Sequence, residues 1–136
     1  MRTDYPGAGV MSRGVKLLVR VALVSALLLV LYLCTSPSEH DLAKSVNDKL
    51  SHAVAFLMLS LLADFSFPET GFSRVKIAPL LAYGMLIECI QYFLPYRSFS
   101  LLDIVADISG IVAYLLILPY LLQLPLLRQR GQLNPS

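Results

Sequence analysis

Four apolar segments, each close to the length of a membrane-crossing helix, constrain this chain more than any other feature of its sequence. They cover about 15–34, 53–67, 75–94 and 101–124. Crossing about 30 Å of hydrocarbon takes around 20 helical residues, so the second segment is short unless it includes residues 46–52. Because a bilayer requires every backbone polar group to be satisfied internally, such segments fold as helices. The sequence therefore predicts an all-α integral membrane protein, with four transmembrane helices forming one domain over residues 1–136.

The composition agrees with burial in lipid. Hydrophobic residues make up 57% of the chain and charged residues only 15%, against about 45–50% and about 25% in soluble domains. A net charge of +2, carried by basic residues scattered along the chain, argues against a nucleic-acid partner.

The basic residues also predict the orientation of the bundle. Loops on the cytoplasmic side of a membrane carry more Lys and Arg than loops on the other side. One side of the predicted bundle has eight basic residues and the other has three: Arg2, Arg13, Lys16, Arg20, Arg74, Lys76, Arg128 and Arg130 against Lys44, Lys49 and Arg97. Both termini are therefore expected in the cytoplasm. No small-x-small cleavage site follows the first segment, so we expect it to be retained as a helix.

Polar residues interrupt or border the apolar segments, and the predicted topology places them near the outer membrane face. We call them the polar cluster: Asp48, Lys49, His52, Glu88, Gln91, Arg97, Ser100, Asp103 and Asp107. A charge near hydrocarbon costs roughly 2.5–3.5 kcal/mol, so such groups are usually paired and often functional. Two explanations remain open. In the first, the cluster is structural, and Arg97 or Lys49 pairs with Glu88, Asp103 or Asp107 to hold the helices together. In the second, the cluster binds a ligand or performs catalysis.

Within the cluster, Glu88 and His52 are the candidate catalytic residues. Asp48 lies four residues before His52 on the same helical face and could orient its ring. No motif predicts a metal site or a cofactor. Gly110 continues the face of Asp103 and Asp107, where a glycine lets a neighbouring helix approach closely.

Other polar, aromatic and sulfur-containing residues have simpler explanations. Asp64 is interpreted as an interface cap at the opposite end of the second helix, and Tyr92, Phe93 and Tyr96 as an aromatic belt. The two cysteines, Cys34 and Cys89, are interpreted as buried small apolar residues, with a single disulfide as the alternative.

From Asp48 to Gly110, the chain resembles the VanZ-like family of small polytopic membrane proteins. The resemblance rests on Asp48-Lys49-x-x-His52, Glu88-x-x-Gln91 and Arg97-Ser98-Phe99-Ser100-x-x-Asp103-x-x-x-Asp107-x-x-Gly110. The chain departs from the family pattern at Asp107, where Asn is more common, and at Tyr96, where Gly commonly precedes the Arg. The resemblance implies a multi-pass protein of the bacterial cytoplasmic (inner) membrane. The family's namesake is linked to resistance against the glycopeptide antibiotic teicoplanin.

These observations lead to three hypotheses about function. The first is a non-enzymatic protein whose polar cluster binds a membrane lipid or a lipid-linked envelope ligand. Two roles are open for it, an effect on teicoplanin susceptibility or a housekeeping role in the cell envelope. The second is a membrane-embedded hydrolase or transferase acting on lipid head groups, with Glu88 or His52 as base and Arg97 stabilising negative charge. The third, proton or ion translocation, lacks a continuous path of polar residues. Dimerisation would bury more of the polar groups, so a homo-oligomer is also considered.

Overall fold

The computed structural model describes residues 11–37 and 42–124, and within these ranges it contains four helices and no strand. The helices are α1 (Arg13–Thr35), α2 (Leu42–Ser66), α3 (Arg74–Tyr92) and α4 (Leu101–Leu121). Each has a stretch long and apolar enough to cross a membrane. The predicted all-α fold is confirmed over these residues, and it fits a multi-pass membrane protein.

The helix boundaries differ from the hydropathy-based prediction. The second helix begins well before residue 53 and includes residues 46–52, so it reaches full membrane-spanning length. The third helix ends at Tyr92 rather than 94, because the residue before Pro95 disfavours the helical conformation. The fourth ends at Leu121 rather than 124. The side chains of Ser12 and Ser100 accept backbone N–H bonds and cap α1 and α4.

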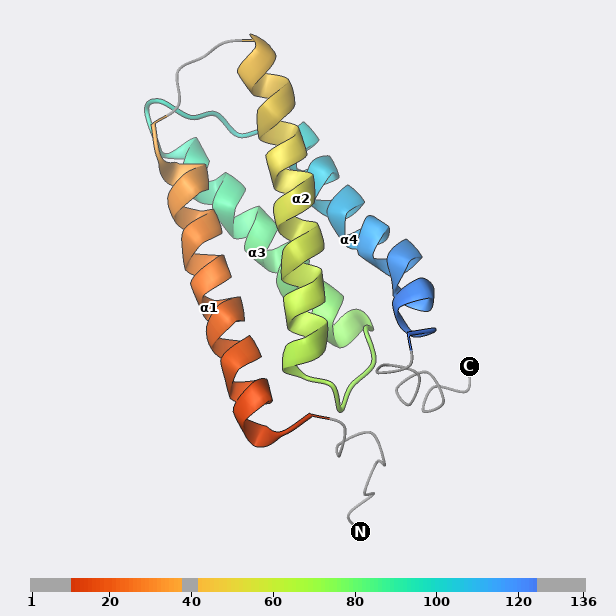
Figure 1. The fold of residues 1–136 in the computed structure, drawn as a ribbon. Helices are drawn as coiled ribbons and strands as arrows, with labels where there is room; N and C mark the ends of the chain where they lie inside the picture. The colour runs from red at the N-terminus through yellow and green to blue at the C-terminus, as the bar shows by residue number, and fades with distance from the viewer. Residues whose placement is uncertain (1–10, 38–41, 125–136) are drawn as a thin grey trace.

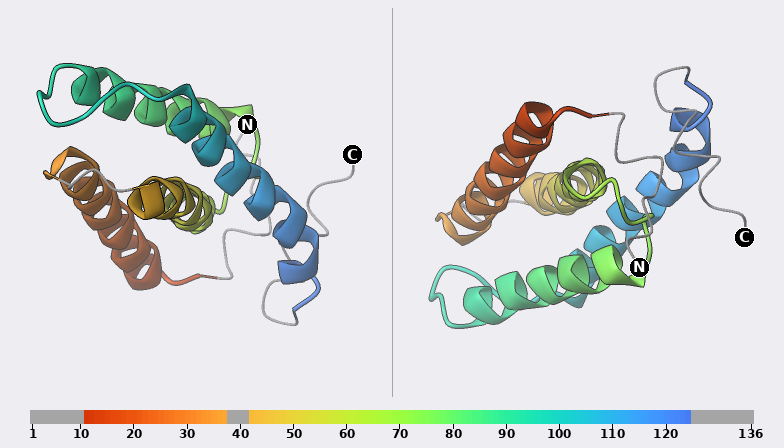
Figure 2. Two further views of the ribbon diagram at one scale, coloured as in Figure 1. Left: turned by 90° about the horizontal axis from the view of Figure 1, so that it is seen from above. Right: turned by 90° about the horizontal axis from the view of Figure 1, so that it is seen from below.

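The four helices run alternately up and down (Figure 1). Viewed along the bundle, α2 lies between α1 and α4, and α3 packs against the other three (Figure 2). This alternation brings the ends of α1 and α3 beside the beginning of α4 and the first half of α2. The topology alone therefore gathers one part of each helix at one end of the molecule.

The interior is small and apolar, and it is built mainly by α2. Phe56, Leu59 and Ala63 pack with Leu80 and Ile111. By contrast, α1 has no buried residue. The outward faces of the helices are largely apolar, as expected for surfaces that contact lipid.

Gly110 allows α2 and α4 to pack closely, as predicted. A Cβ atom at this position would collide with the carbonyl oxygen of Ala53 and lie 2.9 Å from the backbone nitrogen of Leu57. The two helices therefore meet at their backbones, and no larger residue fits between them.

The interpretation of Asp64 as an interface cap is wrong. Asp64 is buried and its carboxylate lies 2.7 Å from the Lys76 ammonium, which is also buried. The Tyr114 hydroxyl donates to the second carboxylate oxygen at 2.7 Å. We call these three residues, Asp64, Lys76 and Tyr114, the Asp64 cluster. It joins α2, α3 and α4 at the end opposite the polar cluster.

Candidate functional site

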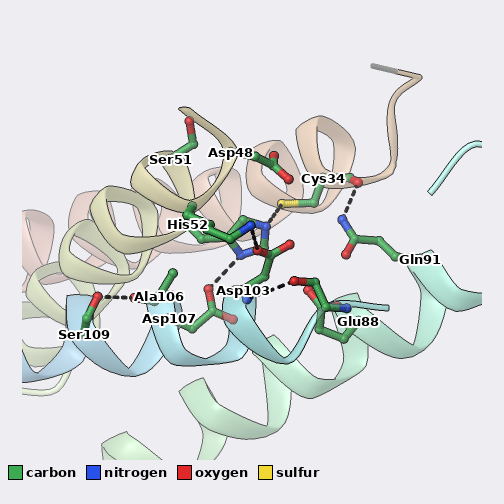
Figure 3. A network of polar contacts seen from close by, with 12 residues as sticks. Cys34, Asp48, Ser51, His52, Glu88, Gln91, Asp103, Ala106, Asp107 and Ser109 are labelled. Carbon is green, nitrogen blue, oxygen red and sulfur yellow. Dashed lines mark hydrogen bonds and ion pairs between the residues drawn. The ribbon is translucent and has the colours of Figure 1, made fainter. Parts of the chain in front are cut away.

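The residues of the polar cluster come together at the end of the bundle where α3 ends and α4 begins. Figure 3 shows six of them, and contacts with these six place the other three, Lys49, Arg97 and Ser100. The nine residues differ in their exposure to solvent. Five of them are buried and four are partly exposed: His52, Glu88, Gln91, Asp103 and Asp107 against Asp48, Lys49, Arg97 and Ser100. The cluster thus has a closed interior and a mouth at the molecular surface.

His52 is held from both sides by residues on other helices. Its Nδ1 lies 2.8 Å from Oδ1 of Asp107 on α4, and its Nε2 lies 3.8 Å from Sγ of Cys34 on α1. The expectation that Asp48 orients this ring is wrong, since the carboxylate bonded to the ring belongs to Asp107. Gly84 on α3 makes room for that carboxylate, because a Cβ there would lie 2.6 Å from Oδ2 of Asp107.

The two basic residues of the cluster pair with two different carboxylates. The Lys49 ammonium lies 3.3 Å from Oδ1 of Asp103, which confirms one of the predicted pairs. Arg97 Nη1 lies 3.5 Å from Oδ2 of Asp48, so the prediction that Arg97 pairs with Glu88, Asp103 or Asp107 is wrong. Both pairs lie at the mouth, where at least one partner is partly exposed.

Glu88 is fully buried, and one of its oxygens accepts the backbone N–H of Ser100 at 2.8 Å. The Ser100 hydroxyl in turn accepts the backbone N–H of Asp103 at 3.3 Å. Ser100 therefore connects Glu88 to the first turn of α4, which explains why this loop serine belongs to the cluster.

Residues from the end of α3 and the following loop cap the last carbonyl groups of α1. Gln91 donates to the carbonyl of Cys34 at 2.8 Å, and Tyr96 donates to that of Thr35 at 3.0 Å. Arg97 donates to the carbonyl of Leu33 at 3.3 Å. The last carbonyls of a helix lack partners within the helix, so these bonds fix α1 to the site. Tyr96 therefore also connects the α3–α4 loop to α1.

The two cysteines were wrongly interpreted as buried apolar residues. Both are free; Cys34 is half-buried and Cys89 is exposed. Cys34 is a member of the site that the sequence did not reveal, because nothing in the apolar run around it marks its contact with His52. A contact between residues 18 positions apart on two helices depends on how those helices are rotated.

Three buried carboxylate oxygens in the site have no hydrogen-bond partner among the described residues: Oε1 of Glu88, Oδ1 of Asp103 and Oδ2 of Asp107. Of these, Oδ1 of Asp103 still contacts the Lys49 ammonium at 3.3 Å. The buried Nε of Arg97 is likewise without an acceptor. Buried polar atoms are usually satisfied, so several unsatisfied atoms in one place need an explanation, such as a bound water, ion or ligand. Asp48, His52 and Asp103 also offer ligand atoms that all lie within 4.8 Å of one another.

Comparisons with known proteins give a partial match. No protein-family model matches the chain, and no solved structure matches it. Uncharacterized protein C11E3.10 of Schizosaccharomyces pombe is 34% identical over 68 residues, which cover 48% of this chain and 42% of that protein. The chain thus spans less than half the length of this relative, whose name states no activity.

Proposed function

We propose that this chain is a VanZ-like multi-pass protein of the bacterial cytoplasmic membrane whose polar cluster binds the head group of a cell-envelope amphiphile. The proposal includes the cytoplasmic placement of both termini, which puts the cluster at the outer face. The observation that carries it is the gathering of nine polar side chains at one end of the bundle, with buried donors and acceptors that have no hydrogen-bond partner among the described residues.

The distribution of charge and exposure supports this function. Asp48 and Lys49 are about one-third exposed, at 36% and 33% of their side-chain areas. Beneath them the buried amide and carboxyl groups can accept or donate to hydroxyls, amines or phosphate oxygens. An amphiphile could place its head group in the mouth of the cluster while its acyl chains stay beside the apolar helix faces.

Native mass spectrometry of the purified protein tests the binding function. Wild-type protein extracted from a bacterial envelope should retain an amphiphile, and Arg97→Ala should retain less because a head-group anion loses its guanidinium partner. Glu69→Gln, in the α2–α3 loop at the opposite end, is the matched control and should retain the wild-type amount. Equal retention by wild type and Arg97→Ala would contradict the proposal.

The effect on antibiotics is tested separately in a sensitive Gram-positive host. Expression of the wild type should raise resistance to teicoplanin but not to vancomycin, because teicoplanin carries an acyl chain. Glu88→Gln and Asp103→Asn should abolish the effect at matched membrane levels. Unchanged susceptibility with confirmed membrane expression would remove the resistance function in that host.

The contacts of His52 favour one second candidate, a membrane-embedded hydrolase or transferase acting on lipid head groups. A carboxylate, an imidazole and a thiol follow one another from Asp107 through His52 to Cys34. Nucleophilic enzymes use this order of orienting group, base and nucleophile. In this candidate His52 takes the proton of the thiol or of a water, which attacks the carbonyl carbon of an ester, and Arg97 stabilises the developing negative charge. The C–O bond to the leaving group then breaks, and His52 returns the proton to the departing alcohol.

Hydrolysis of labelled phospholipids in vesicles distinguishes the two functions. An enzyme should lose turnover completely with His52→Ala and with Glu88→Gln, whereas Cys89→Ser should leave turnover unchanged. A wild-type protein that binds lipid without turning it over would reject the enzymatic candidate and retain the binding function.

A further inference from the structure

We propose that Asp48, His52 and Asp103 bind one divalent transition-metal ion of the Zn²⁺ type. One ligand atom from each residue lies within 4.8 Å of the other two. Asp48 and His52 are four residues apart on α2, and Asp103 lies in the first turn of α4. Small side-chain adjustments bring three such atoms to the 2.0–2.2 Å distances of zinc ligands.

The hydrogen bond between His52 and Asp107 is compatible with a metal ion at the other ring nitrogen of His52. A histidine that binds metal through one ring nitrogen usually donates the proton of the other nitrogen to a carboxylate or carbonyl. Asp107 Oδ1 lies 2.8 Å from His52 Nδ1, and both residues are buried. A neutral ring that donates to Asp107 presents an unprotonated Nε2 to the metal. Asp107 is therefore a positioning residue in this proposal.

A buried carboxyl oxygen beside the three ligands is the second observation that points to a cation. Four carboxyl groups lie in the cluster, on Asp48, Glu88, Asp103 and Asp107, and the permanent cations that pair with them are Lys49 and Arg97. Glu88 is fully buried, and its Oε1 has no partner among the described residues. Figure 3 shows its carboxyl group pointing from α3 toward the start of α4, where Asp103 lies. A divalent ion bound near Asp103 would give this buried oxygen an electrostatic partner.

The donor set selects the class of metal. Imidazole favours zinc and other late transition metals, whereas Mg²⁺ and Ca²⁺ prefer oxygen ligands alone. The Cys34 thiol, 3.8 Å from Nε2 of His52, adds a soft atom beside the site. The exposed part of Asp48 gives the ion a way in, since its carboxylate is the ligand closest to the surface. Lys49 and Arg97, which contact Asp103 and Asp48 in this structure, would move away from these carboxylates on binding.

Zinc binding by the full-length protein in detergent tests the proposal directly. The purification tag is removed, the metal is stripped with a chelator, and Zn²⁺ is titrated in competition with a chromophoric zinc indicator. Wild type should bind about one Zn²⁺ per chain, and an excess of Mg²⁺ should not displace it. His52→Ala and Asp103→Asn should lose this binding, and Asp107→Asn should bind about 10–100-fold more weakly.

Matched controls separate this site from adventitious binding. Cys89→Ser, which removes an exposed thiol, and Glu69→Gln, which removes a carboxylate at the opposite end, should bind Zn²⁺ like the wild type. Asp48→Asn alters the most exposed ligand, so it should fold normally and still lose affinity. Absence of stoichiometric Zn²⁺ binding by the folded wild type would overturn the proposal, as would equal binding by folded Asp48→Asn. Both results are independent of amphiphile retention, so the metal site and the proposed function fail separately.

Discussion

At the scale of single residues, the two ends of the bundle satisfy their buried charges differently. In the Asp64 cluster, both oxygens of the buried carboxylate have partners, one on α3 and one on α4. In the polar cluster, one buried oxygen of Glu88 and one of Asp107 have no hydrogen-bond partner in the part of the chain that the structure describes. The Asp64 cluster therefore has the features of a structural connection, and the polar cluster has those of a site.

Replacing Lys76 should destabilise the protein strongly. Lys76→Met leaves the buried Asp64 carboxylate without its cation, and breaking a buried pair in this way costs about 3–5 kcal/mol. Unfolding measured in detergent micelles should show this loss. The double variant Asp64→Asn/Lys76→Met should recover part of the stability, because the neutral amide can still bond Tyr114. A double variant no more stable than Lys76→Met would contradict this account.

At the scale of helices and the loops that join them, close packing and capping bonds hold the bundle together. The contact of α2 with α4 depends on Gly110, whereas α1 has no buried residue and is attached partly through its last carbonyls. The start of α1 is attached to the α2–α3 loop by an ion pair between Lys16 and Glu69, whose charged atoms are 2.6 Å apart. These contacts differ in strength and can be tested separately.

The variant Gly110→Ala should lower the thermal stability of the bundle. Its Cβ would collide with the carbonyl oxygen of Ala53, and overpacking of this kind costs about 1–3 kcal/mol. Gly14→Ala is the matched control, since the nearest atom to a Cβ there is Ser12 Oγ at 4.0 Å. The control should be neutral or slightly stabilising, because Ala favours helix by up to about 1 kcal/mol. Equal melting temperatures for the two variants would show that the helices can separate without penalty.

The contact between α1 and the α2–α3 loop should weaken in acid. The hydrogen bond from Lys16 lowers the pKa of Glu69 below its ordinary value of 4.5. A lowered carboxyl pKa contributes stability that is fully present above pH 4.5 and is lost as the pH falls through the pKa of the folded state. The effect should be small, because Glu69 is 40% exposed and water screens the pair. Melting curves of wild type and Glu69→Gln should converge below that pH, and a constant difference would reject the linkage.

The number of helices and their order could be predicted from hydropathy, because a lipid-facing helix requires a long apolar run. The gathering of the polar cluster could also be predicted, since alternating helices bring the first part of α2, the end of α3 and the start of α4 to one end. The partners within the cluster could not. The choice of Asp107 rather than Asp48 for His52 depends on the rotation of each helix about its axis, as does the approach of Cys34.

At the scale of the whole molecule, the polar cluster and the Asp64 cluster lie at opposite ends of the bundle with an apolar interior between them. Phe56, Leu59 and Ile111 occupy this interior. The buried Ser60 hydroxyl donates to the carbonyl of Phe56 in its own helix. Within the described residues, this arrangement gives no support to a relay of protons across the bundle.

The proposed orientation of the whole bundle can be tested by labelling single cysteines. In a Cys34→Ser/Cys89→Ser background, Ser98→Cys and Thr70→Cys place exposed thiols in the loops at opposite ends. An impermeant maleimide should label the first in intact cells and the second only after permeabilisation, because most basic residues lie on the side of Thr70. Labelling of Thr70→Cys alone in intact cells would reverse the topology and move the polar cluster to the cytoplasmic face.

The pairing of α2 with later helices has a consequence for how the protein is made. Asp107 and Lys76, the charged partners of its buried His52 and Asp64, lie on α4 and α3, which leave the ribosome after α2. A nascent chain that ends after α2 would therefore leave these two side chains without their charged partners. We expect a chain truncated before α4 to accumulate in the membrane to a lower level than the chain with all four helices.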